Sequence, residues 1–182
     1  MRLRGVFQRL TSAFSRNHFD LLGLRPAYAI DSSDLESRYR ELQGRVHPDR
    51  FAAAPESERR IAMQWAVQAN EAYRTLRDPV GRARYLLALK GFDTGEETNT
   101  AMPADFLMQQ MEWREAVAAA SRTHDAPALG VLRTDIDRAR GEMLQMLARA
   151  MDQDANFDAG CSLVRKLRFL EKLGEEIDEA LG

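Results

Sequence analysis

The residues whose types and spacing could do chemistry lie in the stretch GRVHPDRF, residues 44–51, where His47 and Asp49 flank Pro48. A histidine and a carboxylate two positions apart could form an acid–base pair, part of a metal site, or a rigid loop that a partner protein binds. The proline fixes φ and pushes the residue before it out of the α region, so it ends a helix and presents both side chains in a defined geometry. The surrounding residues must decide among these three kinds of site.

Catalysis or metal binding at this loop is poorly supported. A general base needs an orienting carboxylate within hydrogen-bond reach and a substrate pocket, and no nucleophile or glycine-rich phosphate loop lies near His47. None of the three histidines, His18, His47 and His124, lies four residues from another metal ligand, and Cys161 is the only cysteine. We therefore expect no catalytic residue, no metal and no cofactor. The alternative from a different class is a small helical enzyme or metal-binding protein centred on His47.

The amino-acid composition limits which classes of protein this chain can belong to. The chain has 182 residues, of which 45% are hydrophobic and 30% charged, as is typical of a globular protein rather than a disordered one. Its 26 basic and 28 acidic side chains give a net charge of −2, so nothing calls for a nucleic-acid partner. No apolar run approaches the roughly 18–20 residues that span a bilayer. One cysteine allows no intramolecular disulfide, which favours a reducing compartment and a cytoplasmic location.

The first 16 residues have a different composition. MRLRGVFQRLTSAFSR contains four arginines and no acid, with apolar residues spaced so that one helical face could form. That composition suits an organellar transit peptide, which would place the protein in the mitochondrial matrix. We favour the alternative, a basic N-terminal extension outside the fold of a cytoplasmic protein.

Helical periodicity runs through the rest of the chain, and we expect an all-α fold. A short helix lies in HFDLLGL, followed by a helix that opens at Asp31, Ser32 and Ser33, which can cap free backbone N–H groups. A third helix is expected over about residues 56–76, antiparallel to the second, because the loop that begins with His47 joins them. The stripes expected to be buried are Leu35, Tyr39, Leu42 and Val46 in the second helix, and Ile61, Trp65, Ala69, Ala72, Tyr73 and Leu76 in the third.

The expected domain boundaries follow from these patterns. Residues 17–90 form the first domain, including a closing helix with Leu86, Leu87 and Leu89, and residues 91–102 read as a linker because they lack periodicity. Three further helices are expected over about residues 103–121, 126–152 and 158–181. Their connections are short, so an antiparallel three-helix bundle over residues 103–182 is the economical arrangement.

The first domain resembles the J domain of DnaJ-type co-chaperones. The resemblance covers residues 17–85 and rests on the His47-Pro48-Asp49 loop between two amphipathic helices and on the run NEAYRTLRDPVGRARY, residues 70–85. It implies that the loop binds a DnaK-type chaperone and stimulates its ATP hydrolysis. The helix before the loop usually offers a basic face to that partner, but here Asp34 and Glu41 lie beside the arginines. The implied chaperone-binding residues are His47, Pro48, Asp49, Arg38, Arg45 and Arg50.

The helix near residue 110 has more apolar residues than one core can bury. At about 100° per residue, Phe106, Gln110, Trp113, Val117 and Ala120 cluster on one side. Leu107, Met108 and Met111 lie well round from them, beside Glu112 and Glu115. Phe169 lies off the apolar stripe of its own helix, among Arg165, Arg168 and Lys172. An exposed apolar patch with a charged rim is typical of a partner site, although a helix between two others could also bury a wide arc.

Beyond the J domain, the chain resembles the HscB family of iron–sulfur co-chaperones. The resemblance rests on ARYLLALKGFD, DFLMQQMEWREAV and VRKLRFLEKL and extends over almost all of residues 17–180. It implies that the bundle binds the scaffold protein IscU through Leu107, Met108, Met111, Glu112, Glu115 and Phe169. It also implies delivery of IscU to the chaperone HscA, with Ala119 standing where the family often has an acid. The alternative is a general protein-folding J-domain co-chaperone whose bundle binds another client.

Overall fold

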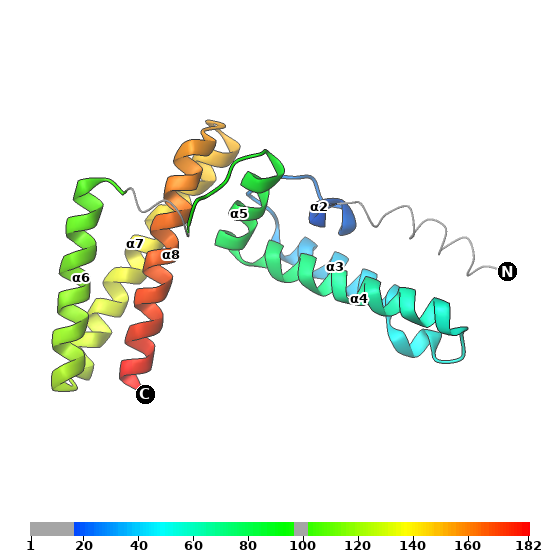
Figure 1. Ribbon diagram of the computed structural model, residues 1–182, viewed down its shortest axis with the longest axis horizontal. Coiled ribbons are helices and arrows are strands. Elements are labelled where there is room, and N and C mark those ends of the chain that lie inside the picture. Colours follow the sequence, from blue (N-terminus) through cyan, green and yellow to red (C-terminus); the bar gives the residue numbers. More distant parts are fainter. Residues whose placement is uncertain (1–16, 97–101) are drawn as a thin grey trace. The chain divides into compact units, whose positions relative to one another are not determined.

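The structure, a computed structural model, describes residues 17–96 and 102–182, with the backbone alone at Pro48. Within these ranges all regular secondary structure is helical, which confirms the predicted all-α fold (Figure 1). The described residues divide into two compact units, with the division between Arg82 and Ala83. The predicted basic extension, residues 1–16, lies outside the described residues. No helix in the described ranges is long and apolar enough to cross a membrane.

The first unit is built on the hairpin of α3, Ser32–Val46, and α4, Glu56–Arg77, which lie side by side (Figure 1). The Asp31 carboxylate caps α3 as predicted, because it accepts from the N–H groups of Ser33 and Asp34 at 2.7 and 3.2 Å. The short helix α2, His18–Leu21, contacts α4 and buries Phe19 completely. Most of the predicted stripe residues are buried, whereas Tyr39, Ile61 and Tyr73 are only half-buried.

Side chains from the NEAYRTLRDP run hold this unit together. The Tyr39 hydroxyl donates to Asn70 Oδ1 at 2.8 Å, and the Tyr39 and Tyr73 rings stack with centroids 4.1 Å apart. Ala72 is fully buried, so α3 and α4 can approach closely there. The Asp78 carboxylate accepts from the Gly81 N–H at 2.7 Å at the start of α5, Pro79–Leu89. The run therefore builds the hairpin and the turn that follows it.

Helix α5 crosses the boundary between the two units. Arg82 is buried and its Nη1 donates to the Leu76 carbonyl at 2.6 Å, within the first unit. Leu87 belongs to the second unit, where it packs close to Gly160. The division at residue 82 falls within α5, so this helix contributes side chains to both units.

The second unit contains the expected antiparallel three-helix bundle of α6, Ala104–Thr123, α7, Ala126–Asp152, and α8, Phe157–Leu181 (Figure 1). Asp125 and Asn156 cap the N-termini of α7 and α8 through bonds to backbone N–H groups. Helices α7 and α8 share the largest interface, and α6 packs against both. The buried cluster at their centre consists of Val117, Ala120, Leu129, Ile136, Leu170, Leu173 and Ile177.

The first part of the predicted linker is anchored to the second unit. Thr94 is buried, and its carbonyl accepts from Arg165 Nη1 at 2.7 Å. Arg84 donates two hydrogen bonds of 2.6 Å to the Glu96 carboxylate, which also accepts from the Thr94 hydroxyl. Within the predicted linker, Thr94 and Glu96 are therefore bonded to the second unit, while residues 97–101 lie outside the described part. These contacts reach across the fold, so local composition could not reveal them.

Glu96 makes the stability of the second unit depend on pH. Burial by itself raises the pKa of its carboxyl, but the bonds from Arg84 and Thr94 outweigh burial and lower the pKa below its usual value. A lowered pKa stabilises the fold above the ordinary carboxyl pKa, and that stability is lost as the pH falls through the folded-state pKa. We expect Glu96→Gln to lower the free energy of unfolding by about 1 kcal/mol near pH 7 and by less near pH 3.

Urea denaturation at the two pH values measures this difference, and Glu179→Gln, an exposed residue of α8, is the matched control. An equal loss of stability at both pH values would show that the charge of Glu96 is not what anchors the segment.

Candidate functional site

The His47-Pro48-Asp49-Arg50 segment, here called the docking loop, begins where α3 ends at Val46. His47 has an extended backbone, with ψ of 129°, as expected of a residue before proline, and Pro48 opens the 3-10 helix η1, Pro48–Phe51. The His47 ring is turned toward this helix, because its Nδ1 accepts from the Asp49 N–H at 3.3 Å. The proline therefore ends α3 as predicted, and the ring caps the short helix that follows.

The docking loop presents its polar groups to solvent. The His47 side chain is 51% exposed and the Asp49 side chain 89% exposed, with 3.6 Å between Nδ1 and Oδ2. No group of three or more potential metal ligands occurs among the described residues. The Cys161 thiol is buried in the second unit, and burial raises its pKa, so it is not an activated nucleophile. The geometry suits contact with a partner surface.

The three arginines expected at the chaperone-binding surface differ in their surroundings. Arg38 bonds to the Asp34 carboxylate at 2.8 Å and to the Gly23 carbonyl at 2.6 Å, so it ties α3 to the preceding turn. Arg50 donates to the Gly44 carbonyl at 2.6 Å. Among the three, only Arg45 has no hydrogen bond or ion pair within the described residues. Of these three arginines, Arg38 and Arg50 are therefore tied to groups of the first unit itself, and Arg45 is not.

Helix α6 turns one side to the core and another to solvent. Phe106, Val117 and Ala120 are buried, as the helical wheel predicts. The apolar patch, defined as Leu107, Met108 and Met111, is 41%, 64% and 62% exposed. The two carboxylates of its rim, Glu112 and Glu115, are also exposed. The prediction that these apolar side chains are at least partly exposed is confirmed.

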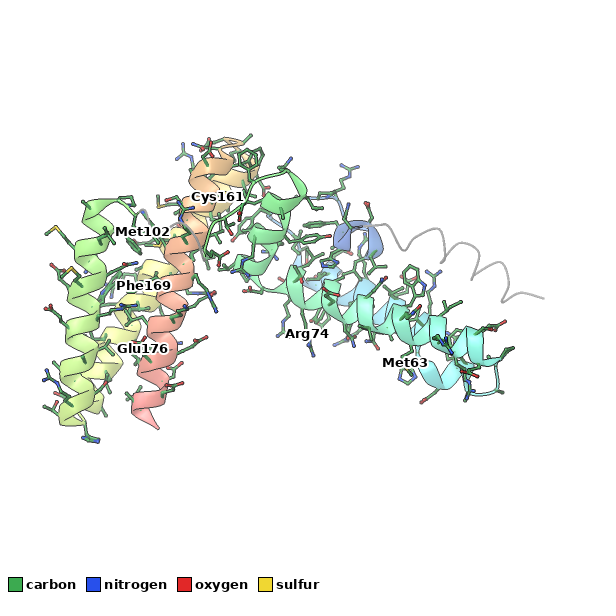
Figure 2. All side chains as sticks on the ribbon, in the orientation of Figure 1. Met63, Arg74, Met102, Cys161, Phe169 and Glu176 are labelled. Atoms are coloured by element: carbon green, nitrogen blue, oxygen red, sulfur yellow. The ribbon has the colours of Figure 1, made fainter. Side chains whose placement is uncertain are left out.

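Phe169 is only partly exposed. It packs against the buried cluster, and its ring meets that of Phe106 edge to face with centroids 6.0 Å apart. The Arg114 guanidinium lies 5.2 Å from the Phe169 centroid. Figure 2 shows Phe169 on α8, on the side toward α6. Phe169 was expected to lie outside the core, but its side chain is half-buried and packs against the buried cluster.

A cavity of ≈ 340 Å³ lies next to the apolar patch, between α6, α8 and Glu96. Its apolar lining comes from Met102, Leu107 and Phe169, so the cavity extends the patch into the bundle. Its basic lining comes from Arg114, Arg165, Arg168 and Lys172. Sequence reasoning missed Arg114, although its spacing of seven residues from Leu107 places both on one flank of α6. The patch is therefore bordered by carboxylates at Glu112 and Glu115 and by basic side chains at the cavity.

The described geometry is that of a J-domain protein with a second helical unit, and comparison with known proteins agrees. The DnaJ domain family matches residues 17–85, and the family described as the HSCB C-terminal oligomerisation domain matches residues 102–178. A co-chaperone protein HscB homolog of Burkholderia multivorans is 48% identical over 88% of this chain and 91% of its own length. The chain belongs to the HscB family of J-domain co-chaperones.

Solved structures show the same likeness. Chaperone HscB from Vibrio cholerae is 37% identical, with a TM-score of 0.78 over 90% of this chain and 96% of its own. Human co-chaperone protein HscB is 28% identical, with a TM-score of 0.84 over 91% of this chain and 82% of its own. The fold is therefore shared by members from bacteria and from humans.

Stability measurements on single variants separate the patch from the core. We expect Met108→Ala to change the free energy of unfolding by less than about 0.5 kcal/mol, because the side chain is mostly in water. Phe169→Ala removes packing against the buried cluster and the Phe106 ring, and we expect it to cost about 1–2 kcal/mol. Urea denaturation followed by circular dichroism gives both values. A large loss for Met108→Ala would place that side chain in the core.

Proposed function

We propose that this protein is an adaptor in iron–sulfur cluster biogenesis that binds the scaffold IscU and delivers it to the DnaK-type chaperone HscA. The observation that carries the proposal is the combination, in one HscB-family chain, of a solvent-facing His47–Asp49 loop and an exposed apolar patch on α6. Neither feature is needed by its own unit, since both lie outside the buried cores. The protein catalyses no bond chemistry itself and acts by bringing two partners together.

The docking loop carries the chaperone side of the proposal. The bond from the Asp49 N–H to Nδ1 orients the imidazole, so less conformational entropy is lost when a partner binds this ring. His47, Pro48 and Asp49 contact the chaperone and promote its ATP hydrolysis, and Arg45 adds attraction to an acidic surface. Hydrolysis then changes the affinity of the chaperone for the scaffold and favours cluster transfer.

The apolar patch carries the scaffold side. Leu107, Met108 and Met111 provide apolar area, and the two methionines adapt to an imperfectly matched surface. Phe169 adds an aromatic ring at the base of the patch, and its packing keeps the ring in place. Glu112 and Glu115 select a scaffold surface with basic side chains opposite them. Ala119 provides no charge, so the acidic side of the patch has two carboxylates, Glu112 and Glu115.

Removing the imidazole tests the chaperone side. We expect His47→Gln to abolish stimulation of HscA ATP hydrolysis, while the circular dichroism spectrum and scaffold binding stay as in the wild type. The reason is that His47 is half-exposed and packs in no core. The measurement is steady-state phosphate release at increasing concentrations of the co-chaperone. Full stimulation by the variant would exclude the docking loop as the activating element.

Truncating the patch tests the scaffold side. We expect the double variant Met108→Ala, Met111→Ala to bind IscU at least about tenfold more weakly in isothermal titration, because two exposed apolar contacts are lost. The matched control is Met146→Ala on α7, whose side chain is 58% exposed but lies outside the patch. If the wild-type protein shows no heat of binding to IscU but binds an unfolded client, it is instead a general folding co-chaperone.

A further inference from the structure

The carbonyl group of Gly44 lies in the last turn of α3, four residues before Pro48. In an α-helix the N–H of residue i+4 donates to the carbonyl of residue i, so the donor for Gly44 would come from residue 48. Proline has no N–H, and this carbonyl therefore loses its helical donor for a covalent reason. Arg50 takes the place of the missing donor, with Nη1 at 2.6 Å from the Gly44 oxygen.

A guanidinium group is well suited to that place. The carbonyl groups at the C-terminal end of a helix carry a partial negative charge, which a nearby cation stabilises. A charged donor also makes a stronger hydrogen bond than a neutral one. The bond joins residues six positions apart and so closes the docking loop, with His47, Pro48 and Asp49 inside it.

A second bond fixes the loop from within. The Nδ1 atom of His47 accepts from the Asp49 N–H, so the proton of the neutral ring lies on Nε2. Nε2 has no hydrogen-bond partner in the part of the chain that the structure describes, and the side chain is half-exposed. His47 therefore presents a donor to solvent, while the Asp49 carboxylate presents acceptors.

We propose that Arg50 is a positioning residue of the docking loop. Arg50 donates to the Gly44 carbonyl in place of the N–H that Pro48 lacks, and this bond holds His47 and Asp49 in their binding geometry. This inference rests on the proposed function and deepens it. Arg50 acts on the chaperone through the loop, not through direct contact. The chaperone surface that fits this geometry has an acceptor opposite His47 Nε2 and a cationic donor opposite Asp49.

Nuclear magnetic resonance of the full-length protein without any partner tests the positioning role. In the wild type we expect a scalar coupling across the hydrogen bond between the Asp49 amide nitrogen and His47 Nδ1. We expect Arg50→Ala to remove this coupling and to speed amide exchange at Asp49. The control is Arg74→Ala, which removes the same charge near the far end of α4. An unchanged loop in Arg50→Ala would overturn the proposal.

The ATPase of HscA provides the functional readout. We expect Arg50→Ala to raise the co-chaperone concentration for half-maximal stimulation about three- to tenfold, with the maximal rate unchanged, because the loop still reaches its geometry when bound. Arg50→Lys keeps a cationic donor, and we expect it to restore the half-maximal concentration and the wild-type loop signals together.

The two experiments separate the possible failures. Weakened stimulation by Arg50→Ala with wild-type loop signals in the free protein would show that Arg50 contacts the chaperone directly, and would overturn the proposal. If the wild-type protein stimulates no DnaK-type ATPase, the proposed function is wrong, and the spectra of the free protein still decide whether Arg50 holds the loop.

Discussion

The missing N–H of Pro48 is the constraint on which the docking loop depends. It ends α3 at Val46, gives His47 an extended backbone and leaves the Gly44 carbonyl without its helical donor. The loop is then closed by side chains, with Arg50 on the Gly44 carbonyl and His47 on the Asp49 N–H. The imidazole and the carboxylate consequently lie outside every buried core and remain available to a partner.

In the second unit the constraint falls on α6, which must pack on the bundle and still offer the proposed binding surface. Its core side places Phe106 and Val117 against α7 and α8, and its outer side carries the apolar patch. Phe169 joins the two sides, since its ring contacts Phe106 and also lines the cavity beside Leu107. Packing that fixes α6 therefore also fixes the floor of the proposed scaffold site.

Much of the fold follows from local rules that can be applied to the sequence. The period of the apolar residues gave α3, α4, α7 and α8 to within about two residues, and the caps at Asp31 and Asp78 are of the expected residue types. The helical wheel also separated the exposed Met108 and Met111 from the core. These features depend on residues a few positions apart in the chain, so they can be predicted from the sequence.

The remaining features depend on contacts between distant residues. Arg38, which resembles a free basic residue in the sequence, bonds to the Gly23 carbonyl 15 residues away. Arg165 donates to the Thr94 carbonyl across 71 residues, and the local composition around Thr94, which indicates a linker, contains no sign of this bond. Phe169 is half-buried because Phe106 of α6 packs against its ring. A helical wheel of α8 alone cannot predict this contact, because it involves another helix. Periodicity reports which face is apolar and cannot report which long polar side chain turns back on the backbone.

In the proposed adaptor role, one molecule must carry both surfaces. The most direct measurement is the rate of HscA ATP hydrolysis in the presence of IscU, with an equimolar mixture of two variants in place of the wild type. One variant lacks His47 and the other lacks the Met108 and Met111 side chains. Because linkage raises the effective concentration of scaffold at the chaperone, we expect the mixture to fall well below the wild-type rate. A mixture as active as the wild type would show that the two surfaces work independently and would contradict the adaptor account.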